Sequence, residues 1–177
     1  MAKFKNTPEY QQMIKMQPAC SEAISNTFKT ATSSIERFPP ESPLFVLDQQ
    51  FAIDVRVKLG NQSTITGQEK ALSNKFHKYR TFTMEFWQNR YDKEPGEFFK
   101  IASQFYLHGY SDETGVQFEE YLIINVLTLM NYLKGFSIEE LSNRTKPAGG
   151  SRASFLPIRY NDLPQEAIMC HYLKDEF

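Results

Sequence analysis

The sequence predicts a mixed α/β domain in which helices cover a sheet of mixed strand direction. Several short stretches alternate apolar and polar residues, as half-buried strands do. Others repeat apolar residues every three or four positions, as amphipathic helices do. Their order is helix, strand, strand, strand, helix, strand, helix, which is typical of a sheet with helices on both faces. A chain of 177 residues has the length of one domain, so we expect residues 1–177 to fold together.

Two helices are expected at the start of the chain. Thr7 can cap the first helix with Pro8 at its first position, and Pro18 should interrupt or kink it. A longer second helix is expected because apolar residues step by four, three, four and three before Pro39 and Pro40 end the pattern. These apolar residues are Ile24, Phe28, Ala31, Ile35 and Phe38.

Residues 51–72 predict a β-hairpin. In the first arm the odd positions 51–59 are apolar and Asp54, Arg56 and Lys58 fall on the opposite face. Gly60 and Asn61 supply the turn.

The hairpin is expected to gather three polar side chains. A turn centred near Asn61 places Asp54 opposite Gln68, with Cβ atoms roughly 5 Å apart. Lys70 shares the parity of Gln68 and therefore its face. A carboxylate, an amide and an amine on one face suggest a metal-dependent site. The alternative is an ordinary solvated face, because these are common surface residues.

The rest of the chain supplies the remaining elements. Residues 81–88 alternate again and predict a third strand, which carries Glu85 on its polar face. Pro95 and Gly96 should begin a helix that reaches Phe105. After these we expect a buried strand over 121–126, a helix through Leu129 and Leu133, a short helix with a capping box of Ser137 and Glu140, a loop over 146–152, a strand over 153–158 and a helix over 164–173.

The charge balance limits how the chain can bind nucleic acid. Twenty Lys and Arg face 21 Asp and Glu, so nonspecific binding through a high net charge is not expected. A local patch could still bind a phosphate backbone, and the candidates are Lys75, Lys78, Arg80, Lys146 and Arg152. Their alternative role is to keep two loops solvated.

The two cysteines, Cys20 and Cys170, lie far apart and predict neither a disulfide framework nor a zinc site. A reducing cytoplasm fits this usage. No stretch has the length and apolar composition of a membrane span, so we expect no membrane association.

This pattern resembles the PD-(D/E)XK nuclease superfamily, which has the restriction-endonuclease-like fold. The resemblance covers residues 19–126, and 127–177 would then be a C-terminal extension. It implies an αβββαβ core with flanking helices, in which Asp54 binds metal and Lys70 is catalytic. The acid that precedes the family lysine by two positions is Gln68 here, as in members with a Gln-x-Lys motif. An amide oxygen can still bind Mg²⁺ or Mn²⁺, with one negative charge fewer.

Another acid could complete the metal site. Glu85 is our candidate, which gives a catalytic set of Asp54, Gln68, Lys70 and Glu85. The metal ligands would be Asp54, Gln68 and Glu85. Glu69 should point to the other sheet face unless a bulge shifts the register. The family often adds a glutamate from the preceding helix, for which Glu22 and Glu36 are available.

The resemblance implies a magnesium-dependent nuclease that hydrolyses phosphodiester bonds, with DNA as the expected substrate. Lys70 would orient the attacking water or stabilise charge on the phosphate, unless it merely forms a salt bridge with Asp54. A catalytically inactive domain of the same fold that binds nucleic acid or protein is the alternative, and an unrelated structural α/β protein is a third. The resemblance also leaves open a homodimer.

Overall fold

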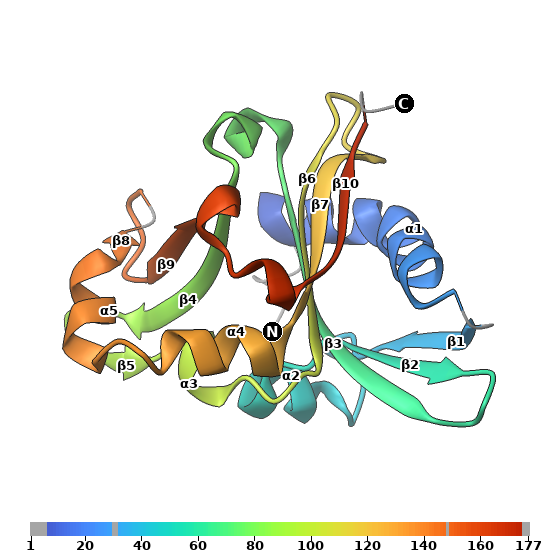
Figure 1. Cartoon of the computed structure of the whole chain (residues 1–177), viewed down its shortest axis with the longest axis horizontal. Coiled ribbons are helices and arrows are strands. Elements are labelled where there is room, and N and C mark those ends of the chain that lie inside the picture. The colour runs from blue at the N-terminus through green and yellow to red at the C-terminus, as the bar shows by residue number, and fades with distance from the viewer. Residues whose placement is uncertain (1–6, 30–31, 148, 175–177) are drawn as a thin grey trace.

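The computed structural model describes residues 7–29, 32–147 and 149–174 and shows a mixed α/β structure with two sheets (Figure 1). In spatial order the larger sheet contains β1 (Thr32–Arg37), β2 (Val55–Leu59), β3 (Thr64–Leu72), β6 (Phe105–Ser111), β7 (Phe118–Asn125) and β10 (Ile168–Leu173). The smaller sheet contains β5 (Glu94–Pro95), β4 (Thr81–Asn89), β9 (Ser154–Arg159) and β8 (Lys146–Pro147).

Helices connect and cover these strands. The α-helices are α1 (Pro8–Phe28), α2 (Phe45–Phe51), α3 (Glu97–Lys100), α4 (Val126–Leu133) and α5 (Ile138–Arg144). The 3₁₀ helices are η2 (Asn74–Tyr79), η3 (Tyr160–Asp162) and η4 (Gln165–Ala167). None of the helices in these described ranges is long and apolar enough to cross a membrane.

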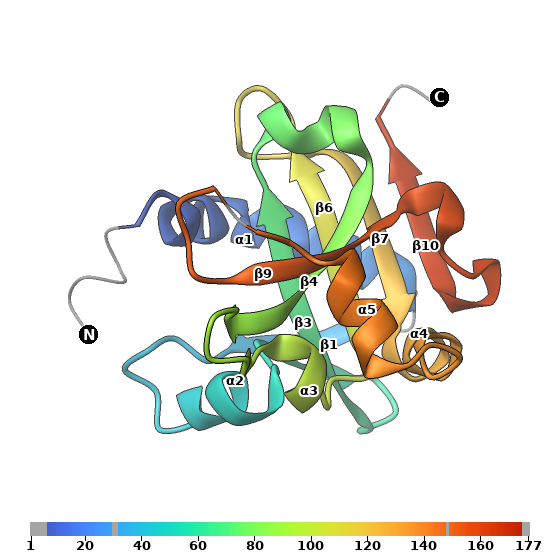
Figure 2. The ribbon, with the colours of Figure 1, turned by 90° about the vertical axis from the view of Figure 1, so that its left-hand side faces the viewer.

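The central strands β6 and β7 of the larger sheet are buried on both faces. Helix α1 packs against one face, where Cys20 and Ile24 contact a core that includes Val55 and Leu107. The smaller sheet packs against the other face, where Phe82 belongs to a second core. Figure 2 shows β4 and β9 in front of β3, β6 and β7, with α1 behind them. The expected helical cover is therefore correct on one face, and a second sheet provides most of the cover on the other.

The predicted hairpin is present with the predicted register. Strand β2 pairs with β3 in antiparallel fashion, and Val55 lies opposite Gly67. The paired register ends there. Asp54 lies just before β2, and its N–H donates to the Gly67 carbonyl at 2.9 Å. Phe51 is not part of the first arm, because it ends α2.

The strand that completes the antiparallel set is not the one predicted. Residues 81–88 do form a strand, β4, but it lies in the smaller sheet. The neighbour of β2 is instead β1, in a segment expected to be helical. Strand β3 pairs in parallel with β6 after a connection that contains β4 and α3, and β7 returns antiparallel to β6.

Three predicted helices were wrong in extent or type. Helix α1 has the predicted Thr7 cap but continues through Pro18 to Phe28, so the second helix does not exist as a separate element. Ala31, which was expected in that second helix, lies outside the described residues. The helix after Gly96 is only the short α3, and Phe105 is in a strand.

The predicted C-terminal helix over 164–173 is η4 followed by strand β10, which pairs with β7. By contrast, α4 and the capping box of α5 are confirmed, because Ser137 and Glu140 exchange both capping hydrogen bonds. The strand predicted over 153–158 is β9, and the strand predicted over 121–126 is the longer β7.

A buried carboxylate ties three segments together at one end of the larger sheet. The Glu120 side chain is fully buried and accepts hydrogen bonds from the Arg80 guanidinium, at 2.6 Å for the closest pair. His77 and His171 lie at 2.9 and 2.8 Å from its two oxygens. Burial raises the pKa of Glu120, but the bonds from Arg80 and His171 outweigh it and hold the pKa below its usual value.

We expect Glu120→Gln to lower the free energy of unfolding by about 1–2 kcal/mol at pH 6, because charged hydrogen bonds are lost. A lowered folded-state pKa stabilises the protein above the unfolded pKa of about 4.3, and this contribution disappears as pH falls through the folded value. The difference between variant and wild type in urea denaturation should therefore shrink toward pH 3. A difference that stays constant would show that Glu120 acts through shape alone.

Candidate active site

Two adjoining pockets contain the residues expected to be functional. One, of about 360 Å³, is lined by Lys70 and Glu85 together with Glu97, Tyr106 and Phe155. The other, of about 580 Å³, contains Asp54 and lies beside α1 and the segment after β1. Asp48, Gln68 and Glu69 line both pockets, so the two pockets adjoin at these residues.

Asp54 is held beside a second carboxylate from α2. Ala52 ends α2 in the left-handed conformation, with φ of 48°, and its N–H bonds back to the Asp48 carbonyl at 3.1 Å. This turn brings Asp48 next to Asp54. Burial raises the pKa of both carboxyls, and the charge of Asp48 raises the pKa of Asp54 further. The pair therefore favours a shared proton or a bound cation over two bare charges.

Gln68 presents an oxygen without a partner. Its Oε1 atom is buried and has no hydrogen-bond partner among the described residues. An unsatisfied buried carbonyl is costly unless a ligand completes it. Asp48, Asp54 and Gln68 line one pocket and offer it a candidate donor set, because hard divalent cations prefer carboxylate and amide oxygens.

The Glu69 side chain lines the same pocket as Asp54 but is bound by Arg37. Its carboxylate forms two 2.8 Å hydrogen bonds with Arg37 on the face covered by α1. Its backbone N–H, however, donates to Asp54 Oδ2 at 2.9 Å and fixes that carboxylate. Glu69 is therefore a positioning residue through its backbone.

Lys70 projects between the two sheets. Its Nζ atom donates to the Thr83 carbonyl at 3.1 Å and lies 4.4 Å from the centre of the Phe155 ring. Burial lowers the pKa of Lys70, while the charges of Glu97 and Glu85 oppose that shift. The predicted alternative of a salt bridge with Asp54 is absent among the described residues.

Glu85 reaches this pocket from the smaller sheet. It lies directly opposite Phe155, which in turn lies opposite Lys146 across β9 and β8. Directly paired residues in antiparallel strands share a face, so these three side chains form one row that faces Lys70. Glu85 is thus brought to the lysine, although the strand that carries it was expected beside the hairpin.

Glu97 is a buried acid that the sequence analysis missed. Gly96 allows α3 to approach β4, because a Cβ atom there would come within 2.8 Å of the Glu85 carbonyl oxygen. Glu97 Oε2 then accepts the Glu85 N–H at 3.2 Å. Its other oxygen and the Tyr106 hydroxyl are both buried. Burial raises the pKa of Glu97, and Lys70 and the interaction with Tyr106 oppose that rise.

The predicted catalytic residues are therefore divided between the two adjoining pockets. Asp54 lines one pocket, Lys70 and Glu85 line the other, and Gln68 lies at the boundary. Within residues 7–29, 32–147 and 149–174, no three His, Cys, Asp or Glu side chains converge on a point that could hold a metal. Glu36 pairs with Arg56 and Glu22 lines a separate pocket, so neither joins the set.

Asp48 and Glu97 carried no signal in the sequence. Asp48 lies in a seven-residue helix that was not predicted, and Glu97 follows the two-residue strand β5, whose pairing with β4 was not predicted either. A buried acid beside a lysine becomes visible only when distant segments are placed together.

The predicted basic residues fall on two segments. Lys75 and Lys78 are exposed on η2, while Arg80 is bound to Glu120. Lys146 is exposed in the row that faces Lys70, and Arg152 is exposed in the loop between β8 and β9. Lys146 is thus the one that shares a face with the pocket.

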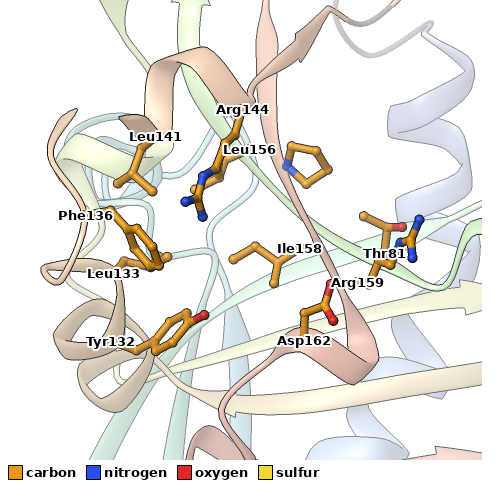
Figure 3. Close-up of a pocket in the computed structure, with 11 residues that line it drawn as sticks. Thr81, Tyr132, Leu133, Phe136, Leu141, Arg144, Leu156, Ile158, Arg159 and Asp162 are labelled. Carbon is orange, nitrogen blue, oxygen red and sulfur yellow. The ribbon is translucent and has the colours of Figure 1, made fainter. Parts of the chain in front are cut away.

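A further pocket lies apart from these residues, between α4, α5 and β9 (Figure 3). Leu133, Phe136 and Ile158 form an apolar part of its wall, and the Arg144 guanidinium lies 4.2 Å from the Phe136 ring centre. It contains none of the predicted catalytic residues. We therefore place the candidate chemistry at Lys70 and Asp54.

Comparisons with protein-family models, with curated proteins and with solved structures gave no significant match for this chain.

Proposed function

We propose that this protein is a divalent-cation-dependent nuclease that hydrolyses phosphodiester bonds, with DNA as its expected substrate. The observation that carries the proposal is the pair of adjoining pockets, one lined by Lys70 and the other by Asp54, which share Asp48 and Gln68. The order of α1, three antiparallel strands, α3 and a strand parallel to the third supports it, because the resemblance implies that order.

The chain's own residues have distinct roles in this proposal. Asp48, Asp54 and the Gln68 oxygen would hold Mg²⁺ or Mn²⁺, which supplies an acidified water and neutralises phosphate charge. The Glu69 N–H fixes the Asp54 carboxylate. The Lys70 ammonium orients the attacking water or stabilises the negative charge that develops on the phosphate.

Two acids keep Lys70 suited to that role. Glu97 and Glu85 favour the charged ammonium, which burial alone would disfavour. The Thr83 carbonyl and the Phe155 ring fix its position. Lys146, on the same face, is placed to contact the phosphate backbone of a bound strand.

A catalytically inactive domain that binds nucleic acid or protein is the second candidate. The specific observation in its favour is that Gln68 replaces an acid and the two carboxylates near it do not form part of a three-acid cluster in the described ranges. Such a domain would keep the basic residues and lose metal-dependent cleavage.

The proposed function is tested with the wild type and Asp54→Asn. We expect the wild type to cleave labelled DNA with Mg²⁺ or Mn²⁺ and to stop when the metal is removed by chelation. Asp54→Asn should lose cleavage on the order of 10²-fold or more. In thermal denaturation, metal at 10–30 times its Kd should stabilise the wild type by about 1.4–2 kcal/mol. It should stabilise the variant less.

The metal-free protein adds a pH signature. Because the folded-state pKa of Asp54 is raised, its stabilising contribution is present below the unfolded value of about 3.9 and is lost as pH rises through the folded value. Asp54→Asn should therefore gain stability relative to the wild type as pH rises.

A folded wild type that shows neither cleavage nor metal stabilisation would favour the inactive domain. Single- and double-stranded DNA and RNA are assayed in parallel to identify the substrate.

A further inference from the structure

The connection between β3 and β4 has a three-residue periodicity in both sequence and structure. Residues 75–80 are Lys, Phe, His, Lys, Tyr and Arg. The first three types, a lysine, an aromatic residue and a second basic residue, are therefore repeated in the next three positions. All of these residues except Arg80 lie in the 3₁₀ helix η2, in which residues three apart lie one above the other, and Arg80 is its C-cap with φ of 41°. Each phase of the repeat therefore becomes one face of the helix.

One phase anchors the helix. His77 and Arg80 bind the buried Glu120 carboxylate, and the His77 ring also packs against Tyr110 with centroids 5.5 Å apart. These contacts hold the short helix in a fixed orientation. The other two phases consequently face outward.

The outward phases carry two lysine and aromatic pairs. Phe76 is 42% exposed and Tyr79 is 60% exposed. The Lys75 ammonium lies 4.9 Å from the Phe76 ring centre, and the Lys78 ammonium lies 5.1 Å from the Tyr79 ring centre. Exposed aromatic rings flanked by cations are the elements with which proteins stack unpaired bases while neutralising phosphates.

The spacing of the rings also suits this use. Three residues of a 3₁₀ helix rise about 6 Å. Two stacking steps of about 3.4 Å need nearly the same separation. A base can therefore enter between the two rings after small side-chain rotations, while each lysine moves from its ring to a flanking phosphate.

We propose that η2 is a stacking platform for unpaired nucleobases, with Phe76 and Tyr79 as the contact rings and Lys75 and Lys78 as the phosphate contacts. The platform begins at Asn74, four residues beyond Lys70, which is about 13 Å away at ~3.3 Å per residue. This separation corresponds to about four stacked nucleotides. Resting on the proposed nuclease function, this inference specifies a substrate that contains a single-stranded segment next to the scissile phosphate.

The test measures binding without cleavage, in the presence of a chelator. Fluorescent 12-nucleotide oligo(dT) is compared with a 12-nucleotide abasic strand of equal charge. We expect the wild type to bind oligo(dT) on the order of 10-fold or more tightly, and Phe76→Ala/Tyr79→Ala to lose that preference. Lys75→Gln/Lys78→Gln should weaken both strands alike and reduce the salt dependence of binding.

Tyr91→Ala is the matched control. Tyr91 is 69% exposed, and the Arg90 guanidinium lies 4.9 Å from its ring centre, but it lies in the turn after β4 rather than on η2. Its removal should leave the preference for bases intact. Equal binding of the two strands by the wild type, or an equal loss in the control and the double variant, would overturn the platform.

The outcome is independent of the proposed nuclease function. Base preference that depends on η2, in a protein that never cleaves, would support the platform and reject the nuclease. Metal-dependent cleavage without any base preference would do the reverse. Circular dichroism and thermal denaturation of each variant verify that the exposed substitutions leave the fold intact.

Discussion

Lys70→Met is expected to reduce DNA cleavage on the order of 10²- to 10³-fold while binding of DNA and metal changes little. The methionine keeps the apolar stem near Phe155 but removes the charge that the proposed mechanism places next to the reacting phosphate. The measurement is single-turnover cleavage, with metal-dependent thermal stabilisation recorded on the same sample. Loss of cleavage with metal stabilisation retained would separate catalysis from metal binding.

The same substitution should also change stability, because Lys70 favours the charged forms of two acids. Without its charge the pKa of the buried Glu97 should rise further. A raised folded-state pKa means that stability is lost as pH rises through it, so Lys70→Met should be less stable than the wild type by about 1–3 kcal/mol at pH 8. The deficit should be smaller at pH 5.

A double variant distinguishes the catalytic effect from the structural one. Lys70→Met/Glu97→Gln removes the acid that is left without its cation and should recover most of the stability at pH 8. It should not recover cleavage. If the double variant cleaves DNA as well as the wild type, Lys70 has no catalytic role and the proposed mechanism is wrong.

The sequence was informative wherever the deciding interactions are local. The hairpin register follows from alternation and one turn, so the pairing of β2 with β3 as far as Val55 and Gly67 could be predicted before the fold was known. The capping box at Ser137 depends on four consecutive residues and is equally local. Strand β4 was recognised for the same reason, because three alternate side chains within it are fully buried.

The errors arose where long-range packing overrides a local pattern. Ile24, Phe28 and Ile35 match a helical period, yet the helix ends at Phe28 and Ile35 lies in a strand beside β2. Thr32, Ser33 and Ser34 are weak helix formers, and pairing with β2 decides their conformation. Residues 168–173 likewise become a strand because the edge of β7 is available for pairing.

The candidate site shows the same division. Asp54, Gln68 and Lys70 come from one hairpin and were found together, whereas Asp48, Glu85 and Glu97 approach from α2, β4 and α3. We chose Glu85 because its own strand was expected beside the hairpin, but that strand, β4, belongs to the smaller sheet. Glu85 still reaches Lys70, because the two sheets face each other at that point.

Gly67→Ala is expected to lower the free energy of unfolding by about 3 kcal/mol, the upper end of the usual cost of overpacking. Gly67 pairs with Val55 on one side and with Phe105 on the other. A Cβ atom there would lie 2.2 Å from Cζ of Phe105, which is itself buried and packs against Phe28 with ring centroids 5.2 Å apart. Urea denaturation of the variant measures the loss.

Two further variants identify the cause. Gly149→Ala is the control, because a Cβ atom at that exposed position meets nothing within 4 Å, and it should change stability by less than about 0.5 kcal/mol. Phe105→Leu leaves space beside Gly67, so the cost of the alanine should be smaller in the Phe105→Leu background than in the wild type. If Gly67→Ala costs no more than the control, β3 can separate from the Phe105 ring without penalty.

The position of Gly67 makes this substitution a test of the site as well as of the core. Its carbonyl accepts the Asp54 N–H, and it immediately precedes Gln68. If Phe105 cannot move, β3 must shift, and the Asp54 and Gln68 oxygens would move apart. Gly67→Ala should therefore weaken metal stabilisation in addition to its cost in stability, and Phe105→Leu should restore both together. Recovery of stability without recovery of metal binding would show that the donor set does not depend on the register at Gly67.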